Sequence, residues 1–122
     1  MPSSDARRAR GNAFDAFDVL VVPFPFTDRA AQKRRPAVAL SRRGVNAATG
    51  HTVCAMVTSA DNPPWPSDVA IRDLEAAGLP AASVIRLKWF TIDNRLILRR
   101  AGALADADRR ALRQVIRGAL DV

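Results

Sequence analysis

The chain has 122 residues, of which 48% are hydrophobic and 25% are charged. This length suits one domain, and the composition excludes a disordered or fibrous protein. A single cysteine excludes an internal disulfide and a multi-cysteine zinc site. The polar N-terminus and the lack of a long apolar run argue against a signal peptide and a transmembrane helix, so we expect a cytoplasmic protein.

The charge balance favours an anionic partner. There are 19 lysine and arginine residues against 12 acidic ones, which gives a net charge of +7. Such a charge attracts polyanions such as nucleic acids. Nearly all the basic residues are arginines, whose guanidinium group binds two phosphate oxygens at once. A codon bias would explain the ratio of arginine to lysine, but it would not explain the net charge.

The first elements are a tail and a strand. Residues 1–16 are polar and carry three arginines without any apolar periodicity, which predicts a flexible basic N-terminal tail. Residues 18–26 form a nearly continuous apolar run rich in valine and phenylalanine, as is typical of a buried strand. Pro23 and Pro25 lack a backbone donor, so the second half of this strand must lie at an edge or leave the ladder.

The middle of the chain predicts two further strands. Residues 27–35 have the composition of a polar, basic loop, and residues 36–41 alternate like a strand. Glycine and asparagine predict a turn over residues 42–50. Residues 51–59 predict a third strand, whose alternate side chains face opposite sides. Residues 60–67 contain N-P-P-W-P and predict a proline-stiffened loop.

Shorter elements follow this loop. Residues 68–71 predict a short strand, and residues 72–78 predict a helical turn that is capped by Gly78. Residues 83–92 are rich in strand-forming side chains. Residues 96–99 predict another short strand.

The end of the chain predicts a helix. From Asp106 onward, apolar residues recur at helical spacing and form one stripe: Ala111, Leu112, Val115, Ile116, Ala119 and Leu120. Asp106 is placed to cap this helix, and Asp108 is placed to favour its positive end. Arg109, Arg110, Arg113 and Arg117 cover the outer face, as is usual for a solvated surface. Several short strands and one closing helix predict a mainly β (α+β) fold, as a small antiparallel barrel or curled sheet.

The usual catalytic residues are scarce. His51 and Cys54 lie three apart on one strand, so their side chains face opposite sides and argue against nucleophilic catalysis by this pair. The acidic residues form no dense cluster, and the chain has no glycine-rich phosphate loop. We therefore predict neither a metal nor a cofactor.

Arginines beside hydroxyl groups remain as candidates. Arg34 and Arg35 precede the second predicted strand, and Thr58 and Ser59 end the third. If these strands are antiparallel neighbours, Arg35 and Thr58 share a small polar site that suits a phosphate. RNA carries its own nucleophile in the 2′-hydroxyl, so such a site could cleave RNA without a metal. Alternatively, these arginines are a solvated strand flank and these hydroxyls satisfy backbone amides.

Seven segments occur in an order that matches a known pattern. They are D-V-L-V-V-P-F-P-F-T-D at 18–28, K-R-R-P-A-V-A-L-S at 33–41, A-M-V-T-S at 55–59, P-W-P-S-D-V-A-I at 64–71, A-G-L-P-A-A-S-V-I-R-L at 77–87, F-T-I-D at 90–93 and a helix after G-A-L at 102–104. Together they resemble the MazF/PemK family of toxin–antitoxin endoribonucleases. The resemblance covers residues 17–122 as one domain. It implies an SH3-like small barrel of the MazF/Kid/CcdB type with a C-terminal α-helix.

The resemblance also implies a function. The family consists of type II toxin–antitoxin toxins that cleave single-stranded RNA, including mRNA, at short motifs without a metal and so inhibit translation and growth. It implies a homodimer, a cognate acidic antitoxin, contact with operator DNA only through the antitoxin complex, and no membrane. The alternatives are a non-catalytic nucleic-acid-binding module on the same barrel and a topoisomerase poison like the CcdB toxins.

Catalytic roles carry over to three positions. The family's arginine and threonine fall on Arg35 and Thr58, and a further arginine in the V-x-R pattern falls on Arg86. We assign substrate binding to the residues near them: Lys33, Arg34, Ser59, Trp65 and Lys88. Trp65 either stacks on a base or staples its loop to the barrel. Phe24 and Phe90 are expected in the core or a dimer contact.

The general base stays open. Lys88 stands where some family members carry an acid, so it can bind phosphate but cannot be a carboxylate base. Arginine does not readily lose a proton, since its pKa lies above about 12. Three aspartates are candidates: Asp28, Asp61 and Asp93. His51 has a suitable ordinary pKa, but it also fits a surface position at the start of a strand.

Overall fold

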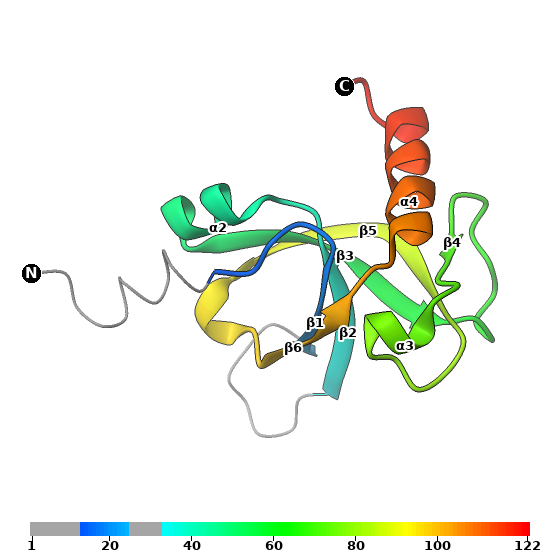
Figure 1. Cartoon of the computed structure of the whole chain (residues 1–122), viewed down its shortest axis with the longest axis horizontal. Helices are drawn as coiled ribbons and strands as arrows, with labels where there is room; N and C mark the ends of the chain where they lie inside the picture. The colour runs from blue at the N-terminus through cyan, green and yellow to red at the C-terminus, as the bar shows by residue number, and fades with distance from the viewer. Residues whose placement is uncertain (1–12, 25–32) are drawn as a thin grey trace, which may run out of the picture.

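The protein is represented by a computed structural model that describes residues 13–24 and 33–122. Within these ranges, six strands form one antiparallel sheet in the order β4-β5-β3-β2-β1-β6, which curls into a half-barrel (Figure 1). The strands are β1 (Asp18–Phe24), β2 (Lys33–Ala39), β3 (His51–Ser59), β4 (Val69–Ala70), β5 (Ser83–Asp93) and β6 (Arg99–Ala103). The helices are α2 (Arg43–Thr49), α3 (Leu74–Ala77) and α4 (Asp106–Ala119), with a 3₁₀ turn at Asn94–Leu96. The mainly β fold with a C-terminal helix is therefore confirmed.

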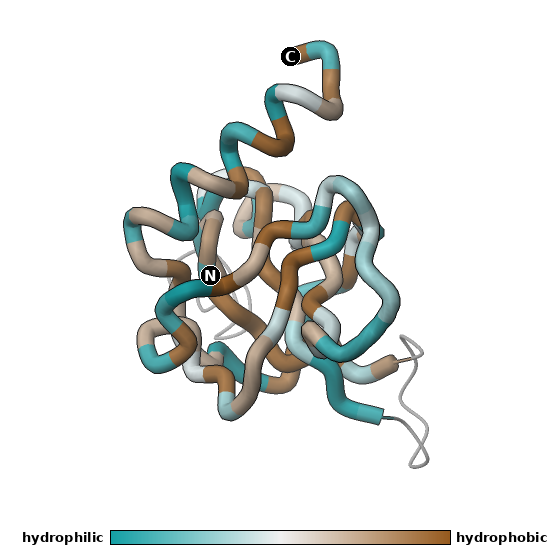
Figure 2. The backbone as a smooth tube through the Cα atoms, turned by 90° about the vertical axis from the view of Figure 1, so that its right-hand side faces the viewer, coloured by the Kyte–Doolittle hydropathy of each residue, from teal (hydrophilic) through white to brown (hydrophobic). Residues whose placement is uncertain are grey.

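The two faces of the sheet carry separate apolar clusters. On β3, Ala55 and Val57 belong to the cluster that α4 covers, whereas Cys54 belongs to the cluster on the other face. Leu112 of α4 is fully buried in the first cluster, but Leu120 after the helix is 40% exposed. Figure 2 shows that the last turns of α4 extend away from the body of the domain. The predicted alternation of β3 and the first part of the α4 stripe thus build the core, whereas the last two predicted members, Ala119 and Leu120, are exposed.

The segment 42–50 is not a turn, and that prediction is wrong. It contains α2, which Gly50 ends in the left-handed conformation at φ 73°. Asn46 is fully buried inside this helix, and its Nδ2 donates to the carbonyl oxygens of Phe14 and Ser41 at 2.7 and 2.9 Å. An asparagine that the sequence suggests for a turn is therefore held in a helix by bonds to residues before it.

The boundaries of β1 and β2 bring basic residues into the sheet. β2 begins at Lys33, so residues 33–35 lie in a strand rather than in the predicted loop, because they pair with the second half of β1. On the other side of β1, β6 pairs only as far as Val21. Pro23 therefore lies where β1 has lost one neighbour, which confirms that this half of the strand is an edge on that side.

The N-terminal boundary also differs from the expectation. Residues 13–16 were assigned to the tail, yet Ala13 is buried and the Arg43 Nε donates to its carbonyl oxygen at 2.9 Å. The Arg43 amide also donates to Asp15 Oδ1 at 2.9 Å. These residues are thus tied to the start of α2, whereas the rest of the predicted tail, residues 1–12, lies outside the described ranges.

Two predictions near the C-terminus are wrong in detail. The last strand is β6, not residues 96–99, because the Asp93 side chain accepts from the Arg95 amide and starts the 3₁₀ turn in that place. Asp106 does not cap α4; the capping position is Ala105, and it makes no side-chain bond. The predicted turn that Gly78 ends is confirmed as α3, where Gly78 has φ 71°.

Candidate active site

A cavity of about 400 Å³ opens where β2, β3 and β5 approach one another. Its lining combines apolar side chains with three cations and one hydroxyl: Phe24, Arg35, Met56, Val57, Thr58, Arg86, Lys88, Trp89 and Phe90. No acidic residue belongs to this lining among the described residues. Such a surface suits an anionic ligand that also has an apolar or aromatic part.

Strand register brings Arg35 and Thr58 to the same cavity. The antiparallel pairing of β2 with β3 ends at Ala37 opposite Met56, and Arg35 and Thr58 lie two residues beyond that pair, where both line the cavity. The Arg35 guanidinium carbon lies 5.6 Å from the centre of the Phe24 ring, a cation–π distance that helps to fix the side chain. Arg35 and Thr58, which we expected to lie close together on adjacent strands, therefore line the same cavity.

The Thr58 hydroxyl is oriented by the loop that follows β3. Asn62 Nδ2 donates to Thr58 Oγ1 at 2.5 Å. A hydroxyl that accepts one hydrogen bond still has its own hydrogen to donate. The bond from Asn62 thus turns Thr58 into a directed donor, which can reach an oxygen of a bound anion.

A bulge in β5 shapes the opposite wall. Ala55 of β3 pairs with Trp89, but the next residue, Met56, pairs with Arg86. Leu87 and Lys88 are therefore extra residues on β5, and Arg86 and Lys88 both reach the cavity. Bulges are frequent beside active sites because they redirect side chains and break the regular pairing.

Arg86 is held by a carboxylate from the β3–β4 loop. Its Nε and Nη2 donate to Oδ1 and Oδ2 of Asp68 at 3.1 and 2.9 Å, and Nη2 also donates to the Pro63 carbonyl oxygen at 2.9 Å. The two side chains are only 11% and 9% exposed. The hydrogen bond from Arg86 lowers the pKa of Asp68 below its ordinary value, and the same pairing raises the pKa of Arg86.

Trp65 covers these cations from outside. The Arg86 guanidinium carbon lies 4.8 Å and the Lys88 ammonium 5.7 Å from its ring. Its backbone amide donates to Asp68 Oδ2 at 2.9 Å. The tryptophan therefore staples its loop to the barrel, and yet the residue is 41% exposed, which leaves part of its surface open to a ligand.

The described residues contain no group of three His, Cys, Asp or Glu side chains that could hold a metal ion. None of the helices in this part of the chain is both long and apolar enough for a membrane span.

Comparison with known families identifies the chain. A model described as a PemK-like, MazF-like toxin of type II toxin–antitoxin systems matches residues 15–120. The chain belongs to the PemK/MazF family. It is thus a MazF-like toxin of a toxin–antitoxin system. No curated protein matches it.

Solved structures confirm the fold of this PemK/MazF chain. The MazE–MazF complex (Form-III) from Deinococcus radiodurans has a TM-score of 0.68 at 21% identity, over 87% of this chain and 94% of that one. The Mycobacterium tuberculosis toxin MazF-mt6 has a TM-score of 0.69 at 22% identity, over 86% and 99%. An endoribonuclease in complex with its cognate antitoxin from a mycobacterial species has a TM-score of 0.69 at 16% identity, over 88% and 93%.

Several predicted site residues of this PemK/MazF toxin lie outside the cavity lining. Lys33 and Arg34 are exposed at the start of β2, and Ser59 is exposed at the end of β3. They therefore flank the site rather than form it. Asp28 lies outside the described ranges.

Two candidates for the general base lie at the wrong end of the sheet. His51 begins β3 and pairs with Asp93 at the end of β5. Thr58 is seven residues further along β3, which corresponds to about 23 Å at the usual rise of a strand. His51 and Asp93 therefore lie far from Thr58, whereas Asp61, the remaining candidate among the described residues, is exposed in the loop after β3.

Sequence reasoning missed the residues that support the site. It did not single out Asp68 or Asn62. It placed Phe24 and Phe90 in the core or a dimer contact; Phe90 does pack against the apolar cluster of Cys54 and also lines the cavity, whereas Phe24 lines the cavity and is 42% exposed. The sequence holds no signal that pairs Asp68 with Arg86, because their approach depends on the register of β4 against β5, in which Val69 lies opposite Ile85.

The distant carboxylate Asp93 allows a prediction about pH. The Arg95 guanidinium, and then the Arg95 amide, hold the pKa of Asp93 at about 2, compared with about 3.9 for an unperturbed aspartate. Because the folded-state pKa is the lower one, this stabilisation is complete above about pH 4 and is lost as the pH falls toward 2. We expect Arg95→Gln to raise the Asp93 midpoint in a carbon-13 NMR titration. An unchanged midpoint would show that the amide alone sets the pKa.

Proposed function

We propose that this toxin is a metal-independent endoribonuclease that cleaves single-stranded RNA, including mRNA, at short sequence motifs and so inhibits translation and growth. The observation that carries this proposal is the joint placement of Arg35, Arg86, Lys88 and Thr58 around one partly apolar cavity. The cations suit the phosphate, and the apolar surface suits a base. Membership in the PemK/MazF family supports the same reading.

The proposed reaction uses the nucleophile of the substrate. The 2′-hydroxyl gives up its proton as its oxygen attacks the adjacent phosphorus, the bond from phosphorus to the 5′-oxygen breaks, and the departing 5′-oxygen takes up a proton, so the reaction neither consumes nor releases protons overall. The products are a 2′,3′-cyclic phosphate and a 5′-hydroxyl. Arg35 binds the scissile phosphate and stabilises the pentavalent transition state, while Arg86 acts as a second clamp. Thr58 directs its hydroxyl to the phosphate or to the 2′-hydroxyl and so aligns the attack.

The surrounding residues bind the rest of the RNA. Lys88 lines the cavity and Lys33 and Arg34 flank it, so we assign them to neighbouring phosphates. Ser59 follows Thr58 and adds a hydroxyl at the rim. The exposed part of Trp65 stacks on a base, which is a common way for proteins to hold single strands.

Partners follow from charge and family. We propose one toxin domain that contains residues 17–122 together with the packed residues 13–16, preceded by a basic segment, and that forms a homodimer in the cytoplasm. A cognate antitoxin with an acidic segment covers the basic groove, and operator DNA is bound only through that complex. The net charge of +7 supports an acidic partner. Structural neighbours include MazE–MazF complexes and an endoribonuclease bound to its cognate antitoxin.

The proposal is tested with a mixed-sequence single-stranded RNA in EDTA. We expect the wild-type toxin to cut at defined positions and to leave cyclic phosphate ends. A matched oligonucleotide with one 2′-deoxyribonucleotide at the mapped cut should stay intact at that position, because it lacks the nucleophile. Cutting of the deoxy substrate would reject attack by the 2′-hydroxyl. RNA binding without cleavage would favour the non-catalytic module, and neither binding nor cleavage would favour a protein target such as a topoisomerase.

A further inference from the structure

Arg86 reaches the cavity with one edge of its guanidinium already occupied. Asp68 accepts from Nε and Nη2, and the Pro63 carbonyl accepts a second bond from Nη2. A guanidinium has five N–H donors in a fixed fork. Among the described residues, no hydrogen-bond acceptor contacts Nη1, and Arg86 belongs to the lining of the cavity, so its two Nη1 donors are not used by the protein in these ranges.

Asp68 is fully engaged in turn. Its Oδ1 accepts from Arg86, and its Oδ2 accepts from both Arg86 and the Trp65 amide. The pairing with Arg86 lowers the pKa of Asp68, so the carboxylate remains charged near neutral pH and is a weak proton acceptor. These contacts favour a structural link to Arg86 over a role as the general base.

We propose that Asp68 is a positioning residue that holds the Nε–Nη2 edge of Arg86 and thereby presents the Nη1 edge to the scissile phosphate. The inference rests on the proposed ribonuclease function. Lys88, two residues after Arg86 on β5, is itself a cation and offers Arg86 no acceptor. In this chain the β3–β4 loop brings a carboxylate to Arg86 from Asp68 instead, at 2.9 Å.

The position of the Arg86 guanidinium matters because the activation free energy of cleavage depends on how well this group is aligned with the phosphate. A misplacement of about 1 Å in a catalytic group can cost about 10²-fold in rate. Arg86 without Asp68 would keep its charge and its stacking on Trp65, but it would lose the bidentate contact that fixes the plane of the guanidinium. We therefore expect Asp68→Asn to lower kcat roughly 10- to 100-fold, with little change in KM.

The chain offers a matched control. Asp93 forms the same type of pair with Arg95, with bonds of 3.2 and 2.8 Å, at the end of β5 remote from the cavity. Asp93→Asn removes an equivalent carboxylate and should leave cleavage unchanged. Asp68→Glu keeps the charge on a longer side chain, so we expect it to restore part of the rate lost in Asp68→Asn. It also provides a second variant if Asp68→Asn does not fold.

The decisive measurement is a double-mutant cycle on RNA cleavage in EDTA, with Asp68→Asn, Arg86→Ala and the double variant. If Asp68 acts through Arg86, the double variant is no slower than Arg86→Ala alone. Effects that multiply would overturn the inference while the ribonuclease function stands. A wild-type toxin that does not cleave would instead reject the proposed function, and with it the role of Asp68 in cleavage.

The free protein gives an independent readout. The Arg86 Nε–H should give a slowly exchanging NMR signal, identified by its loss in Arg86→Lys. We expect this signal to persist in Asp93→Asn and to exchange rapidly in Asp68→Asn. A signal that is unchanged in Asp68→Asn would show that Asp68 does not hold Arg86 in solution, and it would overturn the inference without any measurement of activity.

Discussion

Arg35→Ala is expected to lower the rate of RNA cleavage about 10²- to 10³-fold, which is the usual cost of removing one transition-state donor. Arg35 is half-buried, lines the cavity together with Thr58 and lies against the Phe24 ring. The ring contact restricts the position of the guanidinium before the substrate arrives. Charge builds on the phosphate oxygens only in the transition state, so kcat should fall more than RNA affinity. Single-turnover rates and filter binding on one mapped RNA measure the two effects separately.

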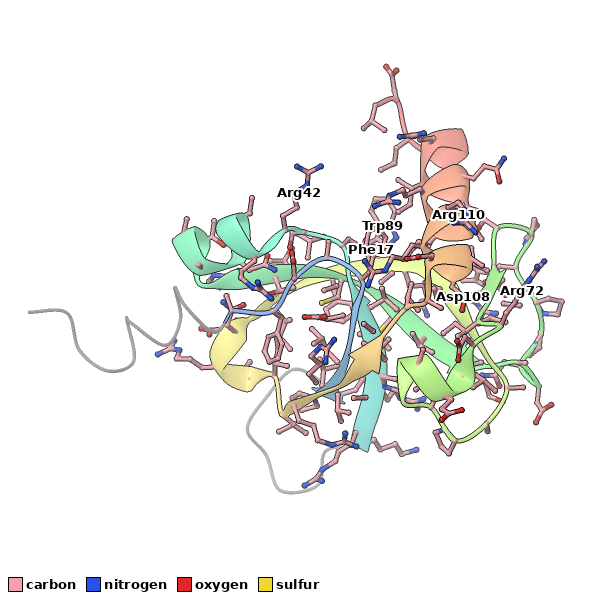
Figure 3. The ribbon with its side chains drawn as sticks, in the orientation of Figure 1. Phe17, Arg42, Arg72, Trp89, Asp108 and Arg110 are labelled. Atoms are coloured by element: carbon pink, nitrogen blue, oxygen red, sulfur yellow. The ribbon has the colours of Figure 1, made fainter. Side chains whose placement is uncertain are left out.

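Two variants separate position from charge. Arg35→Lys keeps the charge but cannot bind two phosphate oxygens in a fork, so its rate should lie between those of the wild type and the alanine variant. Arg110→Ala removes the same charge from the exposed surface of α4 (Figure 3), at a residue that does not line the cavity. It should cleave close to the wild-type rate. Equal losses in Arg35→Ala and Arg110→Ala would show that net charge, rather than a site at Arg35, controls the reaction.

The elements that the sequence predicts well are those with a strong period. β3 alternates over nine residues and matches its predicted bounds, and α4 follows its apolar stripe from Asp106. α2 was missed because its turn-like asparagine is satisfied by distant partners, with bonds to Phe14 and Ser41. Tertiary contacts of this kind override local preference, and a single sequence does not display them.

The candidate site also has one part that the sequence predicts and one part that it does not. The approach of Arg35 to Thr58 needs only that two consecutive strands are antiparallel neighbours, which the sequence suggests. The ion pair between Asp68 and Arg86 requires three features: the pairing of β4 with β5, the bulge at Lys88, and a loop that brings Asp68 back to the sheet. Periodicity contains no information about a bulge or about non-local register. The sequence therefore shows that Asp68 is present, but it does not show that Asp68 pairs with Arg86.

A second large effect concerns stability and depends on Asp108. This residue lies in the first turn of α4, where the sequence suggests only a favourable charge at the helix end. In the structure its carboxylate is 1% exposed and accepts from the Arg72 amide at 3.0 and 3.2 Å and from the Asp73 amide at 3.0 Å. Figure 3 shows Asp108 at the base of α4 close to Arg72. One side chain thus ties the C-terminal helix to the segment between β4 and α3.

We expect Asp108→Ala to lower the free energy of unfolding by about 2–4 kcal/mol, because two backbone donors lose charge-assisted bonds in a water-poor site. Asp108→Asn keeps one accepting oxygen and should cost about half as much. Asp106→Ala removes an exposed acid from the same turn and should cost only about 0.3–1 kcal/mol. Urea unfolding followed by circular dichroism measures all three. If Asp106→Ala and Asp108→Ala lower the free energy of unfolding by similar amounts, charge at the end of the helix alone explains the stabilisation. A much larger decrease in Asp108→Ala would assign the stabilisation to the buried hydrogen bonds between α4 and the segment before α3.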